Sequence, residues 1–364
     1  MATALALHGT LACAEAVEIP LGTPDGFSAN RIDATGGGRY CISGSVYDDS
    51  GPSWSAMVVM VDAQSGRVLW RTPIPYAPDH VSNSPKACGS DGHSIYAVTE
   101  ESTQSAATLN QNVVVLNRIS ATGKLEKQQR LSVGFDEWSW LFSVGANGIT
   151  IAGGTSGTTQ MGGPFGTYVA QFNADLTQTG VKRLPSGAFG NDASASLDGD
   201  RLLVAGSFLP NEGEGHDGYA VSKVDIDKKR YLWSTYALPD AKLTTSALLA
   251  GDGTIYVAGS APSGALTITT IDRTGKIAST FTTKSKAFCH LKTALASGHT
   301  LKVFGNSCKD DATTELLSVD LASHAVSPVH AFHTELQAGG FDGNNWIGVA
   351  KTQAHGLAFV RGSE

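Results

Sequence analysis

One phrase recurs along this chain: a two-residue turn ending in glycine, a short apolar segment and, in most copies, a closing glycine. Its clearest copy is Asp252-Gly253-Thr254-Ile255-Tyr256-Val257-Ala258-Gly259. Asp-Gly and Asn-Gly between apolar segments indicate a β-hairpin, because the tight turn needs residues with positive φ. The turn glycines of all the copies are Gly38, Gly92, Gly148, Gly199, Gly253, Gly298 and Gly343.

The spacing of these turns predicts a repeat architecture. Successive turn glycines are 54, 56, 51, 54, 45 and 45 residues apart. A period of roughly 50 residues has room for about four short strands, which is the content of one propeller blade. We therefore predict an all-β fold, a seven-bladed β-propeller of four-stranded antiparallel blades. The alternative is an irregular β-sandwich, which the regular period disfavours.

The later strands of each repeat follow the same plan until the last one. Third strands such as Met57–Asp62 end in Asp or Asn, which suits the start of a turn, and fourth strands such as Val68–Thr72 follow. The last repeat stops after its third strand, His355–Arg361. The segment Ala16–Leu21 can supply the missing strand and remove an exposed sheet edge. This predicts that the two termini share blade seven.

The chain of 364 residues shows no linker that would divide it. We predict a signal-like segment over residues 1–14 and a single propeller domain over residues 15–364, since Ala12-Cys13-Ala14 before Glu15 is similar to a secretory cleavage site. A net charge of −7 without a basic stripe excludes a nucleic-acid partner. No apolar run of 18 residues exists, so we predict no membrane span, and we expect a monomer.

The cysteines predict two disulfides. Apart from Cys13 there are four, which allow three pairings. The hairpin at Gly298 places residues whose numbers sum to about 597 opposite each other, which makes Cys289 and Cys308 cross-strand neighbours. Cys41 begins the second strand of blade one and Cys88 ends the first strand of blade two, so a bond would join the blades. Disulfides favour a periplasmic or secreted protein, and four reduced thiols in a cytosolic protein are the alternative. No cysteine spacing resembles a zinc site.

The segment Asp62-Ala63-Gln64-Ser65-Gly66-Arg67-Val68-Leu69-Trp70 resembles the repeat of pyrroloquinoline-quinone-type propellers, in which Asp, a Thr-Gly turn and Trp recur at this spacing. Ser65 stands where that repeat usually has Thr, and the motif's Trp occurs only at Trp70 and Trp233. In that family the motif packs blades together, so the resemblance implies a fold rather than an activity. The family's enzymes usually carry an adjacent Cys-Cys pair. None is present here, so the resemblance implies a non-catalytic bacterial relative, such as an envelope scaffold, and no cofactor.

The connections between blades are the predicted place for function, because they lie on one face of a rigid scaffold around the central channel. Acidic groups fall on blades two to four and Lys or His on blades five and six, which predicts a polarised channel mouth. Phe135–Trp140 combines aromatics and acids, a composition common at binding rims, although Trp138 and Trp140 could instead pack the blades. The candidate binding residues are Asp79, His80, Asp136, Glu137, Trp138, Asn191, Asp192, Lys242, Lys286, His290 and His333.

No complete catalytic motif accompanies these loops. Asp79-His80 lacks a Gly-x-Ser-x-Gly elbow, and Asp136 with Asp192 could flank a glycosidic bond only at a suitable separation. We predict no catalytic residue and no metal site. The predicted function is a non-catalytic exported protein that binds a protein partner with one face, as an envelope scaffold or an inhibitor of immunity type. The alternative is a channel-centred hydrolase or lyase acting on a sugar or an ester.

Overall fold

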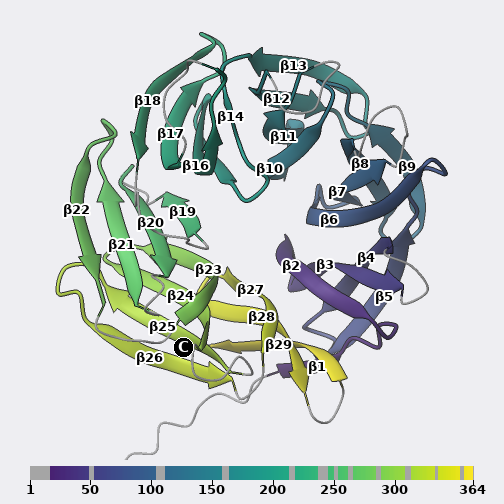
Figure 1. The fold of residues 1–364 in the computed structure, drawn as a ribbon. Helices are drawn as coiled ribbons and strands as arrows, with labels where there is room; N and C mark the ends of the chain where they lie inside the picture. Colours follow the sequence, from purple (N-terminus) through teal and green to yellow (C-terminus); the bar gives the residue numbers. More distant parts are fainter. Residues whose placement is uncertain are drawn as a thin grey trace, which may run out of the picture.

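The computed structural model describes residues 17–48, 53–103, 111–157, 164–212, 218–236, 245–249, 253–260, 265–283, 288–307, 313–332, 335–352 and 356–363. These residues form seven antiparallel sheets arranged as blades in a ring, as predicted (Figure 1). Within these ranges the regular structure is strand, and no helix of the length and apolarity needed to cross a membrane is found.

The first four blades contain strands β2 to β18. Blade one is β2 (Phe27–Gly36), β3 (Arg39–Asp48), β4 (Ser53–Asp62) and β5 (Arg67–Ile74). Blade two is β6 (His80–Ser90), β7 (Ser94–Thr103), β8 (Asn112–Ser120) and β9 (Leu125–Arg130). Blade three is β10 (Glu137–Gly145), β11 (Gly148–Thr155), β12 (Gly166–Phe172) and β13 (Gln178–Leu184). Blade four is β14 (Ala188–Phe189), β15 (Ser194–Asp198), β16 (Arg201–Leu209), β17 (Gly218–Asp225) and β18 (Arg230–Tyr236), in which β14 and β15 both pair with β16.

The last three blades contain the remaining strands. Blade five is β19 (Thr245–Leu249), β20 (Ile255–Ser260), β21 (Leu266–Ile271) and β22 (Ile277–Thr282). Blade six is β23 (Phe288–Ser297), β24 (Thr300–Ser307), β25 (Thr314–Asp320) and β26 (Val326–Phe332). Blade seven is β27 (Leu336–Asp342), β28 (Asn345–Thr352), β29 (Gly356–Ser363) and β1 (Val17–Pro20).

The N-terminal strand closes the ring. β1 pairs antiparallel with β29, from Val17 opposite Arg361 to Pro20 opposite Ala358. Ile19 and the following Leu21 are buried. The predicted sharing of blade seven by the two termini is therefore confirmed, and the outer edge of β29 is covered.

The antiparallel order gives the ring two different faces. The connections between blades and the loops between second and third strands emerge at one face, which we call the connection face. The first hairpin and the last turn of each blade emerge at the other, which we call the hairpin face. All seven predicted turn glycines have positive φ, between 59° and 108°, which confirms the predicted hairpins.

Aspartates at the ends of third strands close the other turns of the hairpin face. The Asp62 carboxylate accepts hydrogen bonds from the backbone N–H groups of Gln64 (2.9 Å) and Ser65 (3.2 Å). Asp320 does the same with Ala322 and Ser323. These backbone N–H groups stabilise the charged form and hold the pKa of Asp62 and Asp320 below the usual value. The prediction that Asp or Asn begins these turns is confirmed at Asp62 and Asp320. It is wrong for Asn117, which is buried within β8, because that strand continues to Ser120 and the turn closes there.

The hydrophobic core lies in the seams between blades. The buried hydrophobic residues of the described chain fall into clusters that each join two adjacent blades. In the seam between blades one and two, Cys41 and Cys88 form the predicted disulfide, with Cα atoms 6.2 Å apart. Both cysteines are buried, and the Cys88 N–H donates to Asp33 on β2 at 3.1 Å.

The second predicted disulfide, Cys289 with Cys308, falls outside the described residues, because Cys308 is not among them. The backbone ladder of β23 and β24 keeps the predicted register only from the turn to Thr293 opposite Phe304. Two irregularities then shift it, so that Phe288 lies opposite Ser307.

Fourth-strand side chains also tie several of the seams at the hairpin face. The Trp70 ring of blade one packs on Gly123 in the last turn of blade two, where an added Cβ would lie 2.6 Å from the ring. The Trp70 indole N–H donates to the Ala121 carbonyl at 3.0 Å. Trp233 of blade four packs in the same way on Gly275 of blade five. These contacts show that the two tryptophans pack adjacent blades together, as expected.

Other residue types make the hairpin-face contacts of three seams that lack these tryptophans. Phe281 of blade five stacks on His324 of blade six, with ring centroids 3.8 Å apart. The Lys127 ammonium donates to the Asp175 carbonyl of blade three at 2.6 Å. Lys182 forms an exposed 2.6 Å ion pair with Asp227 of blade four. The chemistry of the hairpin-face contact therefore changes from blade to blade.

Candidate functional site

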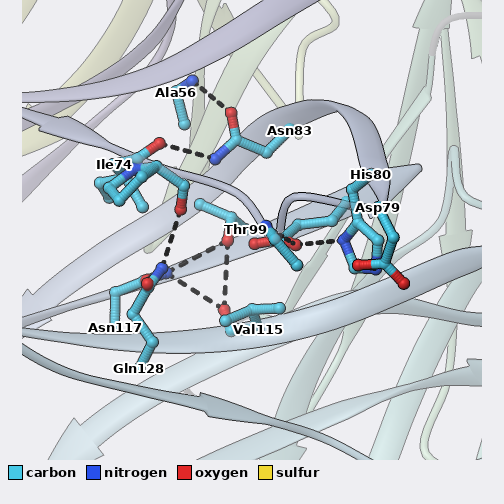
Figure 2. A network of polar contacts seen from close by, with 12 residues as sticks. Ala56, Ile74, Asp79, His80, Asn83, Thr99, Val115, Asn117 and Gln128 are labelled. Carbon is cyan, nitrogen blue, oxygen red and sulfur yellow. Dashed lines mark hydrogen bonds and ion pairs between the residues drawn. The ribbon is translucent and has the colours of Figure 1, made fainter. Parts of the chain in front are cut away.

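The connection that leads into blade two is anchored by a buried histidine. Figure 2 shows the His80 ring beside Asp79, and His80 Nδ1 is hydrogen-bonded to the Glu101 carboxylate of β7. Both partners are buried, and Glu101 also accepts the Ala77 N–H at 3.4 Å. His80 Nε2 lies 3.8 Å from the Asp79 carboxylate, whose side chain is 85% exposed. His80 therefore fixes the loop, and Asp79 is the group that the loop presents to solvent.

Two buried asparagines nearby, absent from the predicted site, hold the first two blades in place (Figure 2). The Asn83 amide donates to the Ile74 carbonyl at 2.8 Å and accepts the Ala56 N–H at 2.6 Å, which joins β6 to blade one. Asn117 donates to Thr99 Oγ1 at 3.1 Å within blade two. Asn117 follows an apolar run in the sequence, whereas Asn83 stands between two serines, so the sequence gives no shared signal for the two.

The connection into blade three places one predicted carboxylate near the surface and buries the other. Asp136 accepts hydrogen bonds from the Asn112 N–H (2.8 Å) and the Ser156 hydroxyl (3.1 Å). Glu137 is 2% exposed, and its Oε1 accepts the backbone N–H groups of Val133 and Gly134. Its Oε2 has no hydrogen-bond partner among the residues described here. Burial raises the pKa of Glu137 to about 7, so its proton is held more tightly than in solvent.

The two tryptophans of this connection pack blades together. Trp138 and Trp140 are buried, and their indole N–H groups donate to the carbonyls of Phe189 (2.6 Å) and Gly190 (2.7 Å) in blade four. Trp140 and Phe189 also meet edge to face, 5.8 Å apart. The structure does not bring Trp138 to an exposed rim, because hydrogen bonding to the next blade holds it inside the seam.

The connection within blade four is exposed. Asn191 and Asp192 lie in the segment between β14 and β15, and both are exposed. The Ser207 hydroxyl donates to Asp192 at 2.7 Å, and the Gly190 N–H donates to the Ser207 carbonyl at 2.7 Å. This short segment is thereby held against β16 with its two polar side chains at the surface.

The remaining predicted residues belong to blades five to seven. Lys242, Lys286 and His333 lie outside the described residues. His290 lies in β23 opposite Asn306, and its side chain is not among those described. The structure therefore describes the acidic half of the predicted channel mouth.

A polar groove, missed by the sequence reasoning, lies on the connection face. Its volume is about 450 Å³. We call it the serine–asparagine groove, and it is lined by Ser28, Asn30, Ser45, Trp54, Ser82, Asn83, Ser84, Lys86, Glu100, Ser102, Asn112 and Asn191. Apart from Trp54, these residues are polar. The run Ser82-Asn83-Ser84 in a first strand was the available signal, but the contributions of blades one and four have no local pattern.

A second cavity of about 520 Å³ lies between the first strands of several blades, at the centre of the ring. Its charged lining residues are Arg31 and Lys292. Arg31 pairs with Asp33 at 2.8 Å, and Lys292 pairs with Glu335 at 3.7 Å. Over the described part of the chain, no group of three His, Cys, Asp or Glu residues is placed to hold a metal ion.

No protein-family model matches this chain, and no curated protein matches it. Its fold is similar to that of several solved propellers. The propeller domain of the Trilobed protease from Pyrococcus furiosus has a TM-score of 0.53 at 9% identity over 94% of this chain and 95% of that one. Saccharomyces cerevisiae Sqt1 has a TM-score of 0.51 at 12% identity over 92% of this chain and 85% of that one.

Puromycin hydrolase has a TM-score of 0.57 at 14% identity over 92% of this chain. The match spans only 51% of that enzyme's length. At these identities the similarities show the propeller fold alone. The Pyrococcus domain is described as having an open velcro topology, whereas β1 here closes the last blade.

Proposed function

We propose that this chain is an exported, non-catalytic binding protein that holds a protein partner over its connection face. The proposal rests on one observation: the described connections combine buried side chains, which hold them in place, with exposed polar side chains. Buried groups such as His80 and Trp140 fix the loops from beneath, and Asp79, Asn191 and Asp192 remain exposed above them. A surface that is already ordered loses little conformational freedom on binding, so its contacts translate into affinity.

The exposed groups define the chemistry of the partner. Asp79 and Asp192 are carboxylates on the connections of blades two and four, and the whole chain has a net charge of −7. A partner with a basic patch would be steered to this face and oriented by it. The resemblance to pyrroloquinoline-quinone-type repeats supports an envelope scaffold, and the same surface suits an inhibitor of a basic secreted protein.

Export is part of the proposal. The buried Cys41–Cys88 bond joins residues that are 47 positions apart. Intramolecular disulfides of this kind are typical of oxidising compartments and rare in the cytosol. The signal-like residues 1–14 support the same location, the periplasm or beyond.

Crosslinking followed by purification from an envelope extract tests the proposal. The partner is identified by mass spectrometry and purified, and its affinity for wild type and for Asp79→Asn/Asp192→Asn is then measured. We expect the double variant to bind roughly tenfold more weakly, mostly through slower association, and the loss to shrink in high salt.

Asp200→Asn is the matched control, because the Asp200 side chain is 79% exposed and lies in a turn of the hairpin face. It removes one exposed carboxylate and should leave the affinity unchanged. Equal affinities of wild type and the double variant, or an equal loss in the control, would overturn the proposal.

A further inference from the structure

The serine–asparagine groove offers hydroxyl and amide groups at close quarters from two adjacent blades. Ser28 and Ser45 are cross-strand partners in blade one, and Ser82 and Ser102 are cross-strand partners in blade two. Hydroxyls and amides both donate and accept hydrogen bonds. Such a lining is complementary to a ligand that itself carries many groups of both kinds.

The charge within the groove is balanced. The Lys86 ammonium lies 3.0 Å from the Glu100 carboxylate, and the Ser139 N–H donates to the same carboxylate at 2.8 Å. Asn112 donates to Glu100 at 3.4 Å and to the Glu137 carbonyl at 2.6 Å. Because Lys86 and Glu100 neutralise each other, the groove favours a neutral ligand over an anion or a cation.

An aromatic surface stands at the edge of the groove. Trp54 is 46% exposed and Tyr47 is 41% exposed, and their rings are 5.0 Å apart at 57°. The two residues are cross-strand partners near the ends of β3 and β4. Adjacent exposed rings offer apolar contact area to a ligand with little loss of rotamer freedom.

We propose that the serine–asparagine groove binds a neutral saccharide, with one pyranose ring stacked on Trp54 and its hydroxyls hydrogen-bonded to exposed polar side chains of the wall such as Ser28, Asn30 and Asn191. The apolar C–H face of a pyranose suits the indole, and its equatorial hydroxyls match the polar wall. Most sites for apolar small molecules are lined by hydrophobic residues, whereas here Trp54 alone is aromatic. A volume of about 450 Å³ is within the range of small-molecule sites and admits more than one sugar ring.

This inference goes beyond the proposed protein partner and does not depend on it. The saccharide site uses Trp54 and the polar ends of blades one and two, whereas the partner is assigned to exposed carboxylates. Trp54→Ala should therefore weaken saccharide binding and keep the protein partner, so that the two proposals fail separately.

Calorimetric titration with chitotetraose, cellotetraose and maltotetraose tests the site, together with sedimentation on insoluble chitin and cellulose. We expect wild type to bind at least one probe and to change its tryptophan fluorescence. Binding of a free tetrasaccharide assigns the site to soluble glycans, and binding to the solid polymer alone assigns it to a polysaccharide surface. Trp54→Ala should weaken binding roughly tenfold, and Trp54→Phe should restore much of it.

Tyr236→Ala is the matched control, because Tyr236 is a 38% exposed aromatic at the connection end of β18 and is not part of the groove. It should bind as wild type does. Far-ultraviolet circular dichroism and thermal unfolding establish that Trp54→Ala is folded. Failure of wild type to bind any of the five probes, or equal binding by Trp54→Ala and wild type, overturns the proposal.

Discussion

The seam between blades one and two and the seam between blades three and four are closed by different means. The first buries small and medium side chains such as Val58 and Ala97, and it contains the Cys41–Cys88 bond. The second buries Trp138, Trp140 and Phe189, with further aromatics packed around them. Large aromatic side chains bury more apolar area than the residues of the first seam, so the second seam is closed without a covalent bond.

The tryptophan contacts of the two seams lie at opposite faces. Trp70 secures the first seam on Gly123 at the hairpin face. Trp138 and Trp140 secure the second seam at the connection face, and Lys182 and Asp227 form an exposed ion pair at its hairpin end. An exposed ion pair contributes about 0–1 kcal/mol, so the aromatic cluster provides most of the stability of the second seam. Blades of similar structure can thus be joined by different kinds of contact, provided that each seam has one.

Among the changes that test these seams, removal of the Cys41–Cys88 disulfide should lower the stability of the protein most. The bond closes a loop with a sequence separation of 47, for which chain entropy predicts a stabilisation of about 4 kcal/mol. We expect Cys41→Ala/Cys88→Ala to lower the free energy of urea unfolding by this amount. A loss under about 1 kcal/mol would mean that apolar burial alone closes the first seam.

A change of pH should act on blade three through Glu137. Burial raises the pKa of Glu137 from 4.5 to about 7, so the folded protein keeps a proton that the unfolded chain has released. The stability from this group is complete below pH 4.5 and is lost as pH rises through 7, in total roughly 3 kcal/mol. Urea unfolding at pH 5 and pH 8 measures the loss.

Glu137→Gln is the control for this pH dependence. Its amide oxygen still accepts the N–H groups of Val133 and Gly134, but the side chain no longer titrates. Its stability should fall less than that of wild type between pH 5 and pH 8. Equal pH dependence in the two proteins would show that Glu137 is not the group responsible.

The sequence predicts the hairpin face of the ring better than the connection face. The turn from Asp62 to Gly66 and the glycine hairpins depend on partners within a few residues, so turn chemistry alone identifies them. Cys41 and Cys88 are far apart in sequence, but the repeat period places them in neighbouring strands near one rim. These features, the blade number and the closing strand are accessible without coordinates.

The connection face depends on partners in other blades, and the repeat does not encode them. The Trp138 indole donates to a carbonyl 51 residues away, so burial or exposure of this tryptophan has no local signal. The serine–asparagine groove combines Trp54 of blade one, Asn112 of blade two and Asn191 of blade four. The sequence therefore predicts where the loops lie but not which of their side chains remain exposed.

The smallest expected effect is the difference in stability between a substitution of Trp138 and one of Trp70. Trp138→Phe leaves the buried Phe189 carbonyl without its donor, and such a loss costs about 1–3 kcal/mol. Trp70→Phe removes a hydrogen bond to Ala121 at an exposed site, where water replaces the indole, so we expect a cost below ~1 kcal/mol. Thermal unfolding of the two variants measures the difference. If Trp70→Phe were the more damaging change, the hairpin-face contact would dominate the stability of the ring, and the first seam would depend on packing more than on its disulfide.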